Sequence, residues 1–107
     1  MNTTQNQVNH VYAEDFAQLM QDENNILIDV RTPGEYMSGR IGEARNIDLM
    51  SPTFTTLIAE LPKDKTCLVY CAGGNRSNTA ASFMVQNGFS NVYNLMGGIM
   101  NWPFDVK

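Results

Sequence analysis

The fold is decided by residues 67–85, which read CLVYCAGGNRSNTAASFMV. The apolar run TCLVYC at 66–71 predicts a strand that is buried on both faces, as in a parallel sheet. Two glycines follow the run, and behind them small and apolar residues recur at helical spacing, which predicts a helix that ends at Asn87 and Gly88. A strand, a glycine turn and a helix in this order are typical of an α/β protein.

The same two patterns alternate along the rest of the chain. This alternation predicts an open, mostly parallel five-stranded sheet with helices on both faces. Ligands bind such sheets beyond the carboxyl ends of the strands, which is where Cys71 lies. The further strands are predicted at 8–12, 25–30, 44–47 and 91–95, and the further helices at 13–22, 33–38 and 52–61.

Two of the predicted helices have recognisable start signals. Thr32 and Glu35 have the spacing of a capping box, and Pro33 would occupy the first helical position. Ser51 and Pro52 repeat the order of a cap followed by proline. A further helix is therefore expected to start at that pair.

Length and charge limit what the protein is expected to do. We expect residues 8–107 to form a single domain and the polar residues 1–7 to be a flexible N-terminus. The formal net charge of −4 argues against a nucleic acid or an anionic membrane as the main partner. No run approaches the roughly 18 apolar residues of a membrane span, and the start lacks the features of a signal peptide, so we expect a cytoplasmic protein. We also expect it to be a monomer.

The two cysteines of the chain lie four positions apart in one predicted strand. The Cα atoms of Cys67 and Cys71 would be roughly 13 Å apart there, which is beyond the reach of a disulfide. A structural zinc site needs four ligands and His10 is the only histidine, so no metal site is expected. Cys67 is interpreted as a core residue.

Cys71 stands where the strand pattern stops. A cysteine in this position is more often a small buried residue than a nucleophile, but the turn that follows it favours the second interpretation. Small and polar residues let the backbone curl so that successive N–H groups point at one centre and form an anion-binding nest. The turn consists of Ala72, Gly73, Gly74 and Asn75.

The residues behind this turn add positive charge and a hydroxyl. The N-terminus of the following helix carries a partial positive charge, and Arg76 supplies a permanent cation. Ser77 is placed to cap the helix or to donate to the Cys71 sulfur. Because each of these features favours thiolate over thiol, the pKa of Cys71 is expected to be depressed.

At these residues the sequence resembles the rhodanese family of single-domain sulfurtransferases. The active-site loop of that family reads cysteine, four residues, arginine and serine or threonine, and Cys71, Arg76 and Ser77 occupy these positions. The stretch DVRTPGEYMSGRIGEARNI at 29–47 is similar to the first family signature. The segment GGIMNW at 97–102 is similar to the closing Gly-Gly-x-x-x-Trp of the family, and it is expected to form a turn with Trp102 as an aromatic plug.

Two positions depart from the family pattern. Arg40 stands where the family usually has histidine, and Glu43 stands where it usually has glycine. Both positions lie outside the loop, so they bear on packing rather than on chemistry.

The resemblance implies a ping-pong sulfur transfer without a cofactor or a metal. The Cys71 thiolate would take sulfane sulfur from thiosulfate or a persulfide and pass it on, as a persulfide, to a thiol, cyanide or a protein acceptor. A phosphatase or arsenate reductase of the same fold is an alternative, but such enzymes place one more residue between cysteine and arginine. A non-catalytic binding module is the other alternative, although inactive relatives typically lose the cysteine.

Three charged residues outside the loop are interpreted as structural support. Asp29 and Arg31 follow a buried strand, and Glu35 lies beside them in the sequence. An acid/base pair is one possible interpretation of this group. Ion pairs and hydrogen bonds that hold loops in place are the more common role at such positions.

Overall fold

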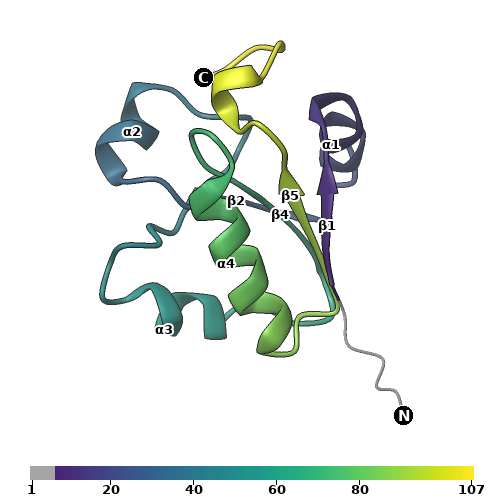
Figure 1. Ribbon diagram of the computed structural model, residues 1–107, viewed down its shortest axis with the longest axis vertical. Coiled ribbons are helices and arrows are strands. Elements are labelled where there is room, and N and C mark those ends of the chain that lie inside the picture. Colours follow the sequence, from purple (N-terminus) through teal and green to yellow (C-terminus); the bar gives the residue numbers. More distant parts are fainter. Residues whose placement is uncertain (1–6) are drawn as a thin grey trace.

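A computed structural model describes residues 7–107, which contain one sheet of five parallel strands (Figure 1). The strand order across the sheet is β1-β5-β4-β2-β3, and each neighbouring pair is parallel. The predicted flexible N-terminus, residues 1–7, lies outside the described residues apart from Gln7. The strands are β1 (Val8–Val11), β2 (Ile26–Asp29), β3 (Arg45–Asn46), β4 (Thr66–Tyr70) and β5 (Asn91–Leu95).

Helices connect the strands and cover both faces of the sheet. In Figure 1, α3 and α4 lie on one side of the strands and α1 lies on the other. The predicted fold class is therefore confirmed, with a sheet that is parallel throughout. The helices are α1 (Ala13–Met20), α2 (Pro33–Ser38), α3 (Phe54–Ala59), α4 (Asn75–Gln86) and the 3₁₀ helix η1 (Ile99–Asn101).

The central strand β4 divides the core into two parts. Cys67 and Val69 belong to the cluster between the sheet and the helices α3 and α4. Leu68 and Tyr70 belong to the second cluster, which contains Phe16 of α1. Because successive side chains of a strand point to opposite faces, a continuous apolar run is the pattern expected of a strand with helices on both sides.

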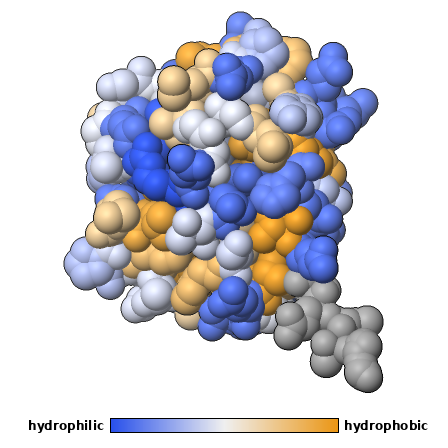
Figure 2. Space-filling view, viewed as in Figure 1, coloured by the Kyte–Doolittle hydropathy of each residue, from blue (hydrophilic) through white to orange (hydrophobic). Residues whose placement is uncertain are grey.

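The longest helix, α4, is amphipathic and separates the core from solvent. Ala80, Ala81 and Met84 are fully buried against the sheet, whereas Asn78 and Gln86 are exposed. Figure 2 shows this side of the molecule, where hydrophilic residues alternate with smaller apolar areas. Within residues 7–107, no helix combines the length and the apolar character needed to cross a bilayer.

The predicted start of α2 is confirmed, but the predicted start of α3 is wrong. Thr32 and Glu35 form the reciprocal capping box, with proline in the first turn. The helix α3 begins at Phe54 because the Ser51 hydroxyl accepts a hydrogen bond from the Thr53 amide (3.2 Å) and closes a separate turn. A serine next to a proline serves a turn as well as a helix, so this signal placed the start two residues too early.

The turn after β5 holds the segment that follows β4. The amide of Ile99 donates to the carbonyl of Cys71 (2.9 Å), and the amide of Met100 donates to the carbonyl of Ala72 (3.0 Å). This close approach requires glycine at position 98, because a Cβ there would lie 2.3 Å from the Ala72 oxygen. The backbone of Gly98 also has a positive φ of 64°, which disfavours other residues.

We predict that Gly98→Ala lowers the free energy of unfolding by about 2–4 kcal/mol, since the new methyl group collides with backbone and the φ angle is strained. Gly34→Ala is the matched control, because no atom lies within 4 Å of a Cβ at that helical position. The control variant should match the wild type or gain up to about 1 kcal/mol. Urea unfolding of both variants measures this, and equal stability of Gly98→Ala and wild type would contradict the prediction.

Candidate active site

Cys71 lies at the carboxyl end of β4, between the sheet and α4. Its residue surface is only 1% exposed, and its side chain belongs to the same core cluster as Cys67. In Figure 1, the loop between β4 and α4 lies at the same end of the sheet as α2 and η1. This end is where parallel α/β sheets bind ligands.

The loop after Cys71 turns back so that backbone amides meet the sulfur. The amide of Gly74 lies 3.1 Å from Sγ, and the amide of Ser77 lies 3.3 Å from Sγ. Gly74 has a φ of 109°, which allows the chain to reverse directly before α4. Residues 71–77 are called the active-site loop from here on.

The hydroxyl of Ser77 adds a contact that depends on the protonation of the sulfur. In the thiol form, Cys71 Sγ donates to Ser77 Oγ (3.3 Å), and that hydroxyl donates to the carbonyl of Gly74 (3.2 Å). When the sulfur is ionised, the Ser77 hydroxyl can turn and donate to it instead, since a hydroxyl is both donor and acceptor.

Two opposing effects determine the pKa of Cys71. Burial is the largest and on its own raises the pKa of the thiol. Hydrogen bonds from the Ser77 hydroxyl and from the amides of Ser77, Gly74 and Gly73 outweigh it, so the pKa of Cys71 is lowered. These bonds stabilise the charged form, which makes the buried sulfur a candidate nucleophile.

The first turn of α4 offers further donors. The amides of Asn75 and Arg76 form no hydrogen bond within residues 7–107, as expected for the first turn of a helix. Asn75 is exposed and Arg76 is half-buried, so the first turn of α4 lies at the surface.

Arg76 forms no hydrogen bond with the Cys71 sulfur, and its guanidinium is directed at a carboxylate instead. Its guanidinium forms a bidentate ion pair with Glu35 of α2, with contacts of 2.8 and 3.0 Å. The hydrogen bond from Arg76 is the largest cause that lowers the pKa of Glu35 to about 2, and the same bond raises the pKa of Arg76. Arg76 interacts with Cys71 through charge alone.

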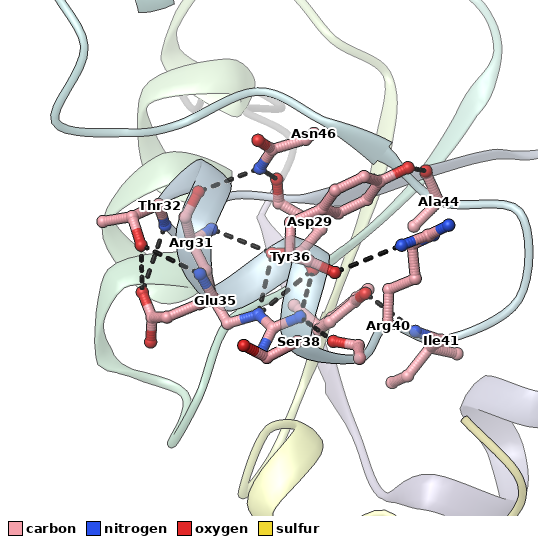
Figure 3. A network of polar contacts seen from close by, with 12 residues as sticks. Asp29, Arg31, Thr32, Glu35, Tyr36, Ser38, Arg40, Ile41, Ala44 and Asn46 are labelled. Atoms are coloured by element: carbon pink, nitrogen blue, oxygen red, sulfur yellow. Dashed lines mark hydrogen bonds and ion pairs between the residues drawn. The ribbon is translucent and has the colours of Figure 1, made fainter. Parts of the chain in front are cut away.

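Asp29 and Arg31 form a second, buried ion pair behind α2 (Figure 3). The Arg31 Nε and Nη2 atoms donate to the Asp29 carboxylate (2.6–3.1 Å), and Nη2 also donates to the carbonyl of Gly39 (2.6 Å). Burial acts against the charge on Arg31, but Asp29 outweighs it and raises the pKa of Arg31. Asn46 donates to the carbonyls of both partners.

This buried pair supports α2 rather than the active-site loop. Asp29 is fully buried and Arg31 is 6% exposed, and within residues 7–107 neither forms a hydrogen bond to residues 71–77. The pair ties the end of β2 to the chain that leaves α2. Of the three residues interpreted as support, only Glu35 reaches the loop.

Cys67 differs from Cys71 in the hydrogen bonds to its sulfur and in the direction of its pKa shift. Both residues are buried, but no backbone amide of residues 7–107 donates to the Cys67 sulfur, and desolvation raises its pKa to about 11. Its thiol has a single contact with a backbone carbonyl, that of Lys65, at 3.8 Å. Within the described part of the chain, no group of three or more histidine, cysteine or carboxylate side chains could hold a metal ion.

The segment after β5 has a larger role than the sequence indicated. Trp102 is half-buried and packs edge-on against Phe16, with ring centroids 6.0 Å apart. The backbone around Gly98 holds the start of the active-site loop through two hydrogen bonds. In the sequence, the pair Gly97 and Gly98 indicates a close backbone approach, but it does not show which segment of the chain is approached.

The chain belongs to the rhodanese-like domain family, whose profile matches residues 12–103. A sulfurtransferase from Allochromatium vinosum is 36% identical over 96 residues, which cover 89% of this chain and 88% of that protein. The thiosulfate sulfurtransferase GlpE of Pseudomonas syringae is 35% identical over 86 residues, or 80% of this chain and 79% of that protein.

Longer proteins and solved structures contain the same domain. The tRNA uridine(34) hydroxylase of Pelagibacter ubique is 33% identical over 100 residues, which cover 92% of this chain but only 33% of that protein. The crystal structure of a rhodanese-related protein from Thermoplasma volcanium is similar with a TM-score of 0.80 and 30% identity, covering 92% of this chain and 97% of that one.

We predict that the Cys71 thiolate is populated at neutral pH because the loop amides stabilise it. In a Cys67→Ser background, the rate of alkylation by iodoacetamide should rise with pH around a midpoint below the value of about 8.5 for a free thiol. Ser77→Ala should move the midpoint upward, since it removes the hydroxyl that favours the thiolate. A midpoint at or above 8.5 in the background protein would disprove the electrostatic account.

Proposed function

We propose that this protein is a sulfurtransferase that carries sulfane sulfur on Cys71 as a persulfide. The donor would be thiosulfate or a persulfide, and the acceptor would be a thiol, cyanide or a protein nucleophile. The observation that carries the proposal is the sulfur of Cys71 in contact with the amides of Gly74 and Ser77. The names of the sulfurtransferase relatives support the same class of activity.

The first half-reaction forms the persulfide. The Cys71 thiolate attacks the outer sulfur of the donor, a new S–S bond forms, and the bond between that sulfur and the rest of the donor breaks. From thiosulfate, sulfite leaves with the electron pair of the broken bond, and Cys71 becomes a persulfide anion. From a persulfide, the leaving group is a thiolate, and the terminal proton stays on the transferred sulfur until it ionises.

The second half-reaction returns the enzyme to its starting state. A nucleophilic acceptor attacks the outer sulfur of the persulfide, takes it, and leaves the Cys71 thiolate with the electron pair. The amides that hold the thiolate make it a better leaving group, because they stabilise the charge that develops on it. No external oxidant or reductant is consumed, so the cycle needs neither a metal nor an organic cofactor.

The unused amides of the first turn of α4 suit the persulfide intermediate. The outer sulfur lies one bond beyond Sγ and carries the charge of the persulfide anion. The N–H groups of Asn75 and Arg76 are free within residues 7–107 to donate to it. Preorganised donors of this kind stabilise charge without the cost of reorienting solvent.

We do not propose a hydroxylase activity, although tRNA uridine(34) hydroxylases are among the relatives. The similarity covers only a third of the hydroxylase from Pelagibacter ubique. The net charge of −4 does not favour a nucleic acid as a partner. We therefore propose small molecules or protein thiols as the reaction partners, and we further propose that the protein is a cytoplasmic monomer.

We predict that treatment with thiosulfate or glutathione persulfide adds one sulfur atom to the intact protein, and that cyanide or a reductant removes it. Mass spectrometry of the intact protein measures the gain. Cys71→Ser should abolish it, because Cys71 is the sulfur held by the loop amides. Cys67→Ser should retain it, since a buried thiol with a pKa of about 11 is a poor nucleophile.

Two results would contradict the proposal. If neither donor adds sulfur, the binding-module alternative is favoured. If the protein instead hydrolyses an aryl phosphate with a rate that depends on Cys71, the phosphatase alternative is favoured. The spacing of Cys71 and Arg76, with four residues between them, argues against that second outcome.

We also predict a weak KM for thiosulfate, because Ala72 offers the donor no charged contact. Ala72→Arg should lower that KM about ten- to a hundredfold, the effect of one charge-assisted contact of about 1.5–3 kcal/mol, with less change in kcat. Persulfide donors should respond less. Steady-state kinetics with both donors decides this, and an unchanged KM would show that residue 72 does not affect donor binding.

A further inference from the structure

We infer that Glu35 determines which sulfur donors the protein prefers. By neutralising Arg76, it disfavours dianionic donors such as thiosulfate, so that persulfides are the preferred donors. This inference rests on the proposed sulfur transfer and names its substrate class. Glu35 lies in α2, 41 positions before Arg76, the cation with which it pairs.

The geometry pairs the charge of Arg76 with a carboxylate. Both terminal nitrogens of its guanidinium donate to Glu35, Nη1 to Oε1 at 2.8 Å and Nη2 to Oε2 at 3.0 Å. A bidentate pair of this kind neutralises the guanidinium and occupies two of its five N–H donors. An anionic donor would have to displace the carboxylate or bind the remaining donors of a cation whose charge is already paired.

Glu35 is held in place by contacts of its own. Its Oε1 atom accepts hydrogen bonds from the amide and the hydroxyl of Thr32, both at 3.1 Å. These bonds belong to the capping box that starts α2, so a swing of the carboxylate away from Arg76 would also weaken the helix. The carboxylate is therefore a fixed partner of the cation.

The charges around the loop do not favour a dianion. The Glu35 carboxylate pairs with Arg76 directly, and the Cys71 sulfur, when ionised, adds a second negative charge to the same loop. The protein as a whole carries a net charge of −4. Thiosulfate would bring two further negative charges, whereas an alkyl persulfide brings at most one at the reacting sulfur.

The pair is also accessible enough to influence an incoming donor. The side chain of Arg76 is 30% exposed and that of Glu35 is 36% exposed. Both therefore lie at the boundary between the loop and solvent, where a donor has to approach. Hydrogen bonding by Arg76 lowers the pKa of Glu35 to about 2, so its charge is present throughout the working pH range.

Glu35→Gln tests this inference, because glutamine retains the capping box but loses the charge. The matched control is Glu43→Gln, which removes one negative charge from an exposed carboxylate that is paired with Lys107. The efficiency kcat/KM for thiosulfate, with cyanide as acceptor, should rise about tenfold in Glu35→Gln, mainly through KM. The efficiency with 2-hydroxyethyl persulfide, whose only charge is on the reacting sulfur, should change less than about twofold, and Glu43→Gln should change neither.

Three kinetic results would overturn the inference. Thiosulfate efficiency could stay unchanged or fall in Glu35→Gln, which would mean that Glu35 only positions Arg76. It could rise equally with both donors, which would indicate a general effect on the loop. Glu43→Gln could reproduce the gain, which would assign it to net charge.

Equilibrium binding keeps this inference separate from the proposed function. Calorimetry can compare thiosulfate binding to Cys71→Ser and to the double variant Cys71→Ser/Glu35→Gln, neither of which can turn over. The double variant should bind about tenfold more tightly, by the same electrostatic argument. Equal binding would overturn the role of Glu35 even if sulfur uptake by the wild type succeeds, and tighter binding would support it even if uptake fails.

Discussion

The hydrogen bonds from the amides of Gly74 and Ser77 to the Cys71 sulfur are the contacts on which the site depends. A cysteine that is 1% exposed would resist ionisation without them, because desolvation is the largest effect on its pKa. To provide them, the chain must reverse within the four residues between β4 and α4 and start a helix at once. The glycine with positive φ at position 74 makes this reversal possible.

Two other parts of the chain hold this reversed loop from opposite sides. The turn after β5 binds the carbonyls of Cys71 and Ala72 through the amides that follow Gly98. The helix α2 holds Arg76 through Glu35, and the buried pair of Asp29 and Arg31 braces the chain behind it. The donors are thus fixed before a substrate arrives, which is the condition under which hydrogen bonds contribute most to catalysis.

Patterns of neighbouring residues predicted much of this structure. Most of the features that could not be predicted are contacts between residues that are distant in the sequence. The strand β4 and the capping box at Thr32 depend on neighbouring residues, so the sequence identifies both. The start of α3 was placed too early because the Ser51 side chain bonds to a turn amide instead of a helical one. The partner of Arg76 could not be predicted, since Glu35 approaches it only once the sheet has brought α2 and α4 together.

The most direct test of the account is a pH titration of the backbone amides by NMR spectroscopy. If the amides of Gly73, Gly74 and Ser77 donate to the sulfur, their proton resonances should move downfield together as Cys71 ionises, with one shared midpoint. The same resonances should not titrate in Cys71→Ser. Amides that keep constant shifts while Cys71 ionises in the wild type would contradict the claim that the loop stabilises the thiolate.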